Sequence, residues 1–349
     1  MKTSVVIATY NGSRFIEDQL TSILHQTVLP SEIVVSDDGS TDSTVEVVRS
    51  IYQQNKDLPI DFKLVINNSG SHGVQKNFQN AVINSTGDYI FFCDQDDVWL
   101  PNKIERLVSV LDRCEEQVII HNAQVIQETA EGSFQLIDRY LMGPYPFGSD
   151  GLFKIDGPSQ VWFAFYTCAI QGMCMCAKRN YLLKIMPFSN GLYHDYWTLF
   201  CAAADNSLLA VADVLAYYRI HKNNTAGISE LRKKRSIFAR ISTFDRRGSS
   251  SIVDQYTWYI DTSAYLDTRP ILNDKVNQLI SFFTKERITA IAQNKIHATI
   301  SLFDAYKKGA YSIDGKIIFI HDLAYVWMHT KKTRLKLLSK LGSNLRHRD

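Results

Sequence analysis

The sequence contains no long hydrophobic run. The longest candidate, residues 317–328, is interrupted by His321 and Asp322, whereas a membrane-spanning helix needs about 18–20 consecutive apolar residues. The first residues enter an apolar, strand-like segment at once, without the regions that make up a secretory signal peptide. We therefore expect a cytoplasmic protein that is at most peripheral on the inner face of the cell membrane.

Cysteine is scarce, with six residues in a chain of 349. The cysteines lie mostly inside apolar runs and form no paired framework, which favours buried, reduced thiols. Cys174 and Cys176 are separated by a single residue, whereas the ligands of a zinc pair are separated by about two to four. We therefore expect neither disulfide bonds nor a zinc site.

A large net charge is also absent, but the charges are unevenly spread. Residues 1–230 carry 16 Lys and Arg against 26 Asp and Glu, and residues 231–349 carry 22 against 10. Such a split usually marks two functional regions, so we predict one domain over 1–230 and a basic, mainly helical region over 231–349. The basic region either docks on an anionic membrane or packs as solvated helices on the first domain. No recognisable nucleic-acid-binding module accompanies the charge.

Strand-like and helix-like segments alternate in the first part of the chain. Short β-branched runs predict strands, and apolar residues at helical spacing predict helices. The expected strands cover residues 3–9, 31–35, 62–66 and 88–92, and the expected helices cover residues 14–25, 43–51 and 74–84. This order predicts an α/β fold with a mostly parallel, doubly wound sheet, in which ligands bind at the carboxyl ends of the strands.

The turn after the first expected strand excludes one common function of this fold. A dinucleotide-binding dehydrogenase carries the pattern G-x-G-x-x-G at that position. This chain carries Tyr10, Asn11 and Gly12 there instead. A Rossmann-type dehydrogenase is therefore disfavoured.

Carboxylates follow the second and fourth expected strands. Asp94, Asp96 and Asp97 fall within four residues, and like charges this close repel unless water, hydrogen bonds or a cation compensates them. A hard divalent ion such as Mg²⁺ or Mn²⁺ would do so; the alternative is an acidic surface turn. Asp37 and Asp38 precede Gly39 in a pattern that also fits an ordinary Asx turn.

Four segments together resemble the inverting family 2 glycosyltransferases, which have the GT-A fold. They read SVVIATYNGSRFIEDQLTSILHQT, EIVVSDDGSTDST, NSTGDYIFFCDQDDVWLPNKIE and HDYW, and the likeness covers residues 1–227. The variant DQDDVW, with YRIHKNN after it, looks most like bacterial polysaccharide enzymes that include rhamnosyltransferases. The resemblance implies a mostly parallel Rossmann-like sheet flanked by helices, followed here by the helical C-terminal region.

The resemblance implies a nucleotide site and a metal site. The Tyr10 ring would lie against the nucleobase, and Asp38 would accept a hydrogen bond from the imide N–H of uracil or thymine, which favours UDP or dTDP over GDP. The full nucleotide set is Thr9, Tyr10, Asn11, Asp38, Lys76, Asp94 and Gln95. Mn²⁺ or Mg²⁺ would be held by Asp96 first, then by Asp94 and His221; a structural or surface histidine is the alternative for His221.

Asp195 matches the family's catalytic base, which removes a proton from the acceptor hydroxyl. The family usually shows Glu-Asp there, whereas this chain has His194 before Asp195; a packed histidine is the alternative for His194. The residues expected near the acceptor or the sugar are Asp97, Gly172, Met173, His194 and Trp197. Alternatively, Asp97 caps the following helix and Trp197 is a core residue.

The resemblance therefore implies a metal-dependent hexosyltransferase of bacterial surface polysaccharide synthesis. It would move a sugar from a UDP- or dTDP-sugar, with dTDP-rhamnose among the candidates, to a glycan or lipid-linked acceptor. The alternative is a nucleotide-binding protein of the same fold that has lost transfer activity. Both interpretations require Asp38, Asp96 and Asp195 to meet at one edge of the sheet.

Overall fold

The computed structural model describes two units of the chain, Met1–Ile228 and Ser229–Asp349. The described residues are 1–67, 72–129, 131–142, 147–154, 171–188, 193–221, 290, 293–307, 323, 326 and 327. Most of the second unit lies outside these ranges, as do residues 155–170 of the first unit. Each unit is considered by itself.

The first four strands form a parallel sheet in the order β3-β2-β1-β4. They are β1 (Thr3–Thr9), β2 (Glu32–Asp37), β3 (Asp61–Ile66) and β4 (Tyr89–Cys93). The chain runs outward from β1 to β3 and then returns to the other side of β1. The strand order thus reverses between β1 and β4, and a crevice at the carboxyl ends of the strands is the usual ligand site at such a point.

Antiparallel and long strands extend the sheet beyond β4. The order continues β4-β9-β6-β10-β5, with β7 paired to β6 and β8 paired to β10. The added strands are β5 (Val98–Trp99), β6 (Val118–Glu128), β7 (Phe134–Tyr140), β8 (Leu152–Lys154), β9 (Met175–Lys178) and β10 (Leu208–Ile220). The parallel pair β6 and β10 brings the end of β10 to the end of the sheet that carries the β4 loop.

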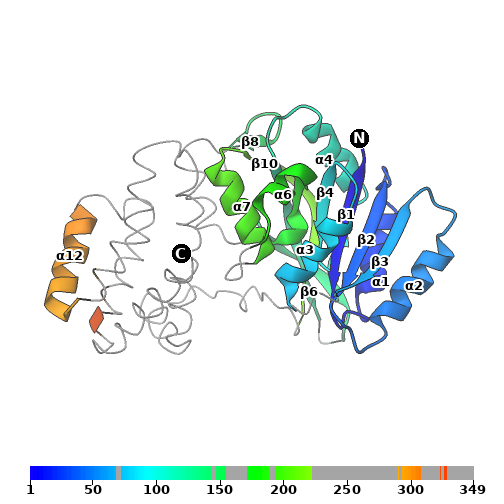
Figure 1. Cartoon of the computed structure of the whole chain (residues 1–349), viewed down its shortest axis with the longest axis horizontal. Coiled ribbons are helices and arrows are strands. Elements are labelled where there is room, and N and C mark those ends of the chain that lie inside the picture. Colours follow the sequence, from blue (N-terminus) through cyan, green and yellow to red (C-terminus); the bar gives the residue numbers. More distant parts are fainter. Residues whose placement is uncertain are drawn as a thin grey trace. The chain divides into compact units, whose positions relative to one another are not determined.

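Helices cover both faces of this sheet (Figure 1). α1 (Ile16–Leu24) packs against α2 (Thr44–Gln54), whereas α3 (Val74–Asn84) packs against α6 (Arg179–Ile185) and α7 (His194–Ala204). Because helices lie on both sides, the central strands are buried on both faces and read as continuous apolar runs. Val5, Val6 and Ile7 of β1 are fully buried in succession. A further helix, α4 (Lys103–Leu111), follows β5.

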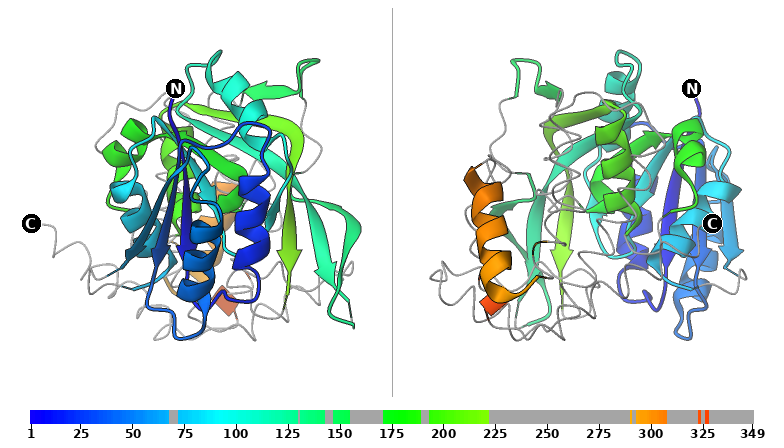
Figure 2. Two further views of the ribbon diagram at one scale, coloured as in Figure 1. Left: turned by 90° about the vertical axis from the view of Figure 1, so that its right-hand side faces the viewer. Right: turned by 60° about the vertical axis from the view of Figure 1, so that its left-hand side comes forward.

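The structure confirms the predicted fold class. The apolar runs and helical spacings locate β1 to β4 and α1 to α3 to within three residues at each end. Residues 208–212, another short apolar run, form the first part of the long strand β10. In the second unit one helix, α12 (Lys295–Lys307), is described over several turns (Figure 2). Among the described residues no helix is long and apolar enough to cross a membrane.

Candidate active site

A cavity of about 630 Å³ opens at the carboxyl ends of the central strands. Asp38, Asp96 and Asp195, which are far apart in the sequence, all line it. The complete lining is Ala8, Thr9, Tyr10, Asp38, Gly39, His72, Gly73, Val74, Asn77, Phe78, Asp94, Gln95, Asp96, Gln171, Tyr193, His194, Asp195, Tyr196 and Tyr218. The convergence on which the sequence interpretation depends is therefore present.

The two aspartates after β2 have different surroundings. Asp37 closes a local turn, because its carboxylate accepts hydrogen bonds from the backbone N–H groups of Gly39 (3.1 Å) and Ser40 (2.8 Å). It also accepts one from the Thr9 hydroxyl at 2.9 Å. The Thr9 side chain is consequently directed to Asp37, and Thr9 contributes to the cavity from the end of β1.

Asp38 lines the cavity and is held from three sides. Its Oδ1 accepts a hydrogen bond from Asn67 Nδ2 (2.8 Å) and lies 2.9 Å from His72 Nδ1, while its Oδ2 accepts one from the Gly73 N–H (2.8 Å). These donors come from the segment between β3 and α3. They fix the orientation of the carboxylate, and an ionised carboxylate has about four acceptor positions, so one position remains for a ligand.

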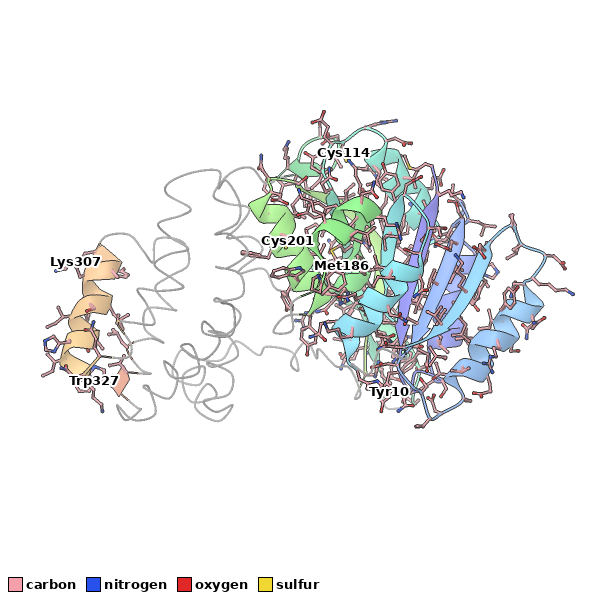
Figure 3. The ribbon with its side chains drawn as sticks, in the orientation of Figure 1. Tyr10, Cys114, Met186, Cys201, Lys307 and Trp327 are labelled. Atoms are coloured by element: carbon pink, nitrogen blue, oxygen red, sulfur yellow. The ribbon has the colours of Figure 1, made fainter. Side chains whose placement is uncertain are left out.

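Gln95 joins the β4 loop to the β1 loop. Its Oε1 accepts a hydrogen bond from the Tyr10 N–H at 2.9 Å, and its Nε2 donates to the Tyr10 carbonyl at 3.1 Å. Gly12 is required beneath this side chain, because a Cβ there would lie 2.2 Å from Gln95 Oε1. The Tyr10 ring, 57% exposed, is left at the mouth of the cavity, and Figure 3 labels it at that end of the sheet.

Asn11 has a linking role and does not line the cavity. It adopts a left-handed backbone conformation, with φ of 47°. Its N–H donates to Ser40 Oγ (2.9 Å), and its side-chain oxygen accepts from the Thr41 N–H (2.8 Å). The expectation of direct nucleotide contact by Asn11 is therefore replaced by a link between the β1 and β2 loops.

The acidic loop after β4 brings Asp94 and Asp96 into the cavity. Asp96 Oδ2 lies 2.9 Å from His221 Nε2, and the His221 ring packs on Phe15 at 4.5 Å between centroids. Burial, followed by the charges of Asp96 and Asp195, raises the pKa of Asp94 to about 8. This accumulation of negative charge fits a site for a hard divalent cation.

The protein supplies only part of a cation's coordination shell. Within the described ranges, no three His, Cys, Asp or Glu side chains are already arranged around a common point. Mg²⁺ and Mn²⁺ bound to phosphate substrates commonly take one or two carboxylates, with the remaining ligands from phosphate and water. Asp96 and Asp94 fit that donor set, with His221 beside them.

Asp97 corrects the sequence interpretation. Its side chain is fully buried and does not reach the cavity, so it cannot hold the sugar. It does not cap α4 either: its Oδ1 accepts a hydrogen bond from the Arg219 N–H at 2.8 Å. Burial, with the charges of Asp96 and Asp94, raises its pKa well above the ordinary value. Asp97 ties the acidic loop to the end of β10.

Asp195 stands at the start of α7, with its side chain in the cavity. It accepts a hydrogen bond from the Tyr196 N–H at 2.8 Å. Burial raises the pKa of Asp195 to about 6, although backbone amides, those of Tyr196 and Gly172 among them, oppose the shift. A carboxyl with this pKa is ionised at neutral pH and is a stronger proton acceptor than an exposed aspartate.

His194 lies in the cavity wall as a packed aromatic side chain. Its ring stacks on Phe78 at 3.9 Å between centroids, and burial lowers its pKa to about 3. Gly172 lies so close that a Cβ there would be 2.5 Å from His194 Nε2. His194 is therefore a neutral spacer between the core and Asp195, in agreement with the packed alternative.

Besides Asn11 and Asp97, five expected site residues lie outside the cavity lining; one is His221, which contacts the lining residue Asp96. Trp197 is buried and its indole N–H donates to the Ile185 carbonyl at 2.8 Å, which is the core alternative. Lys76 is on α3 but does not line the cavity. Gly172 and Met173 are buried in a short 3₁₀ turn (Gly172–Cys174) behind the cavity, and the preceding Gln171 is the residue that lines it.

Sequence reasoning missed the segment that orients Asp38. Asn67, His72 and Gly73 come from the end of β3 and the start of α3. Gly73, with φ of 111°, carried a local signal, since a glycine directly before a helix often marks an unusual backbone conformation. The aromatic wall of Tyr193, Tyr196 and Tyr218 was also missed, because tyrosines in apolar runs do not reveal which side they face.

The chain is similar in sequence to known glycosyltransferases. The model of the family named Glycosyl transferase family 2 matches residues 4–169. An uncharacterized glycosyltransferase of Nostoc sp. is 29% identical over 228 residues, which span 64% of this chain and 66% of that protein. The dTDP-rhamnosyl transferase RfbG of Shigella flexneri is 28% identical over 235 residues, 63% of this chain and 73% of that protein. The matches thus leave roughly a third of each chain uncovered.

Solved structures show the same fold. The S. aureus TarS fragment 1–349 in complex with UDP-GlcNAc has a TM-score of 0.59 at 16% identity, covering 99% of this chain and 92% of that one. The mannosyltransferase PcManGT of Pyrobaculum calidifontis, in complex with GDP-Man and Mn²⁺, has a TM-score of 0.50 at 16% identity, covering 100% and 88%. The chain therefore has the GT-A fold, and its residues 4–169 match glycosyl transferase family 2.

Proposed function

We propose that the protein is an inverting glycosyltransferase that moves a sugar from a UDP- or dTDP-sugar to a hydroxyl of a glycan or lipid-linked acceptor. The observation that carries this proposal is that Asp38, Asp96 and Asp195 line one cavity where the strand order reverses. Glycosyl transfer from a nucleotide sugar needs a group that recognises the nucleobase, a group at the diphosphate and a proton acceptor. Asp38, Asp96 and Asp195 are proposed for these three roles in that order.

Asp38 is proposed to select the nucleobase. The imide N–H of uracil or thymine would donate to the carboxylate that Asn67, His72 and Gly73 hold in place. A fixed acceptor rejects bases that cannot donate to it. The printed names of two similar proteins, a dTDP-rhamnosyl transferase and a TarS complex with UDP-GlcNAc, are compatible with this choice. The exposed Tyr10 ring would cover the base.

Asp96 and Asp94, with His221 beside Asp96, are proposed to hold Mn²⁺ or Mg²⁺. When bound, such an ion offsets the negative charge that develops on the departing nucleoside diphosphate. The Mn²⁺ named with PcManGT supports this role by analogy. Burial, followed by the charges of Asp96 and Asp195, raises the pKa of Asp94, and a bound cation would favour its ionised form.

Asp195 is proposed as the general base of a single displacement. The acceptor oxygen forms a bond to the anomeric carbon, the bond from that carbon to the diphosphate oxygen breaks, and the hydroxyl proton passes to the Asp195 carboxylate. Attack from the face opposite the diphosphate inverts the anomeric configuration. Gln171, Tyr193 and Tyr196 lie in the same cavity wall and would contact the acceptor or the transferred sugar.

We propose that the second unit contacts an anionic membrane. Ile296, Ile300 and Phe303 form an exposed stripe on α12, although the opposite face already packs through Ala298 and Leu302. The exposed isoleucines of this stripe, Ile296 at 66% and Ile300 at 61%, suit contact with the apolar part of a membrane interface. The basic balance of residues 231–349 complements anionic lipid. Part of this basic balance is a cluster of Lys331, Lys332, Arg334 and Lys336 that would face the lipid; it lies outside the described residues.

Nucleotide-sugar turnover tests the proposed function. UDP- and dTDP-sugars are first screened for thermal stabilisation of the protein with Mn²⁺, and those that stabilise are then assayed for release of nucleoside diphosphate with acceptor. Asp195→Asn should lower turnover by about 10²–10⁴-fold. Asp213→Asn, a surface aspartate paired with Arg106 outside the cavity, should not. Binding without turnover by the wild-type protein would favour the inactive nucleotide-binding alternative.

A further inference from the structure

Lys103, the first residue of α4, is fully buried. A lysine is almost never fully buried unless it is paired, because removing an ammonium from water is costly. The proposed reaction gives it no part, and it does not line the cavity. Its burial therefore calls for an explanation in what it contacts.

The Lys103 ammonium is held between an aromatic ring and a carbonyl. Its Nζ donates a hydrogen bond to the Met173 carbonyl oxygen at 2.7 Å and lies 3.6 Å from the centroid of the Trp99 ring. Burial raises the pKa of Asp94 and of Asp97, and the Lys103 charge is close enough to both carboxyls to oppose part of that rise. The ammonium is thus the positive charge beneath the acidic loop.

The turn that Lys103 holds carries donors for two cavity carboxyls. The backbone N–H of Met173 lies near enough to the Asp94 carboxyl, and that of Gly172 near enough to the Asp195 carboxyl, to oppose the rise that burial causes in the pKa of each. One short 3₁₀ turn, Gly172–Cys174, therefore presents adjacent N–H groups to the two ends of the reacting site. Met173, whose N–H faces Asp94, is also the residue whose carbonyl accepts from Lys103.

The turn has little freedom to move by itself. Gly172 approaches α7 so closely that a Cβ would lie 2.5 Å from His194 Nε2 and 3.6 Å from the Asp195 Cβ. A small displacement of the turn would therefore shift both the contact of Gly172 with Asp195 and its packing against His194. The hydrogen bond from Lys103 to the Met173 carbonyl is a second restraint on the turn.

We propose that Lys103 is a positioning residue for the proposed transfer reaction. By binding the Met173 carbonyl it sets the Gly172–Cys174 turn, and through the two amides of that turn it sets the distance and direction between Asp94 and Asp195. The expected effect of Lys103 on kcat rests on the proposed function. Its expected effect on the mobility of the turn does not depend on activity.

The test compares Lys103→Met with the wild-type chain. Methionine has a similar length and no donor, so the Met173 carbonyl loses its partner. Lys178→Met is the matched control, because the Lys178 ammonium also donates to a backbone carbonyl, that of Glu115 at 3.0 Å, on the surface. Lys103→Gln, which keeps a neutral donor, replaces the methionine variant if the latter does not fold.

Two readouts decide the outcome. In the unliganded protein, amide hydrogen exchange in the 171–175 segment should become about tenfold faster in Lys103→Met and stay unchanged in Lys178→Met. In the transfer assay, kcat should fall by about tenfold or more, with the Kd for UDP without metal changed by less than about twofold. A general loss of stability would not produce that split.

Either of two results would overturn the inference. Unchanged exchange in Lys103→Met would show that the turn does not depend on the ammonium, and unchanged kcat with faster exchange would show that the turn does not position the reacting groups. A wild-type protein without transfer activity would instead remove the proposed function, and the exchange result would still decide whether Lys103 holds the turn.

Discussion

The proton acceptor of the proposed reaction is placed where its ionised form is unfavourable. Burial raises the pKa of Asp195 from its ordinary 3.8 to about 6. The folded chain therefore holds this proton more tightly than the unfolded chain does. Ionisation of Asp195 costs stability as the pH rises through about 6, and the cost is absent below 3.8. At the residue scale, the proposed transfer requires the ionised Asp195 carboxylate, whereas folding favours the protonated carboxyl.

Asp195→Asn should therefore stabilise the protein while abolishing transfer. A shift of about two pKa units corresponds to about 2–3 kcal/mol at neutral pH. We expect the thermal unfolding midpoint of the variant to exceed that of the wild-type chain at pH 7.5, with the difference shrinking toward pH 4.5. A lower midpoint at pH 7.5 would mean that the Asp195 carboxylate is stabilised in the fold.

The same pKa predicts the acid limb of the rate profile. The base acts as a carboxylate, so kcat/KM should fall about tenfold per pH unit below the pKa of about 6. The measurement is the initial rate of nucleoside diphosphate release from pH 5 to 8. A rate independent of pH across this range would remove Asp195 from the role of base. Asp213→Asn should leave the profile unchanged.

Local sequence signals located the helices and strands, whereas the partners of individual site residues depend on contacts between distant parts of the chain. β-branched runs and helical spacing fixed β1 to β4 and α1 to α3, because these patterns depend on neighbours in the chain. The cavity position of Asp38 and Asp96 followed from the rule for parallel sheets, whereas that of Asp195, at the start of α7, came from the family resemblance. Asp97 could not be assigned from sequence, because its partner is the backbone of Arg219 on β10.

The loops after β1 and β4 act as one element through Gln95. Its side chain bonds both the N–H and the carbonyl of Tyr10 and occupies the space above Gly12. This contact explains why a glutamine stands between Asp94 and Asp96 and why a glycine stands after Asn11. The sequence showed both residues, but nothing in their spacing indicated that they touch.

Gly12→Ala should weaken nucleotide binding with little loss of stability. The added Cβ would displace the end of the flexible Gln95 side chain, which releases the Tyr10 loop. We expect the Kd for UDP with Mn²⁺ to rise several-fold, about 1 kcal/mol. Gln95→Ala should give a similar loss, and the double variant should lose no more than either single one, because both remove the same link. Additive losses in calorimetric titrations would contradict this link.

At the scale of the whole molecule, the acidic and basic parts of the chain are proposed to serve different surfaces. The first unit carries the carboxylate-lined cavity, and the second carries α12 with its exposed stripe. Trp327 borders α12 through its indole N–H, which donates to Thr299 Oγ1 at 3.2 Å, and Figure 3 labels it with Lys307 at the two ends of the helix. Exposed isoleucine, phenylalanine and tryptophan beside lysine suit a membrane interface.

Ile300→Glu should weaken binding to anionic vesicles. A buried carboxylate in the stripe removes apolar contact and repels the lipid head groups. His297→Glu, exposed on α12 outside the stripe, is the control for the added charge. We expect co-sedimentation with phosphatidylglycerol vesicles to fall several-fold more for Ile300→Glu than for His297→Glu. Equal sedimentation of both variants with the wild-type protein would contradict membrane docking through α12.

The central claim is that Asp38, Asp96 and Asp195 belong to one nucleotide-sugar site, and calorimetric titration of UDP and dTDP tests it most directly. We expect Mn²⁺ to strengthen nucleotide binding by the wild-type chain and by Asp195→Asn. Asp96→Ala should bind nucleotide equally well with and without Mn²⁺. Asp38→Ala should bind nucleotide more weakly than the wild-type chain, with or without Mn²⁺. Equal affinity of all four proteins, or a wild-type chain that binds neither nucleotide, would contradict it.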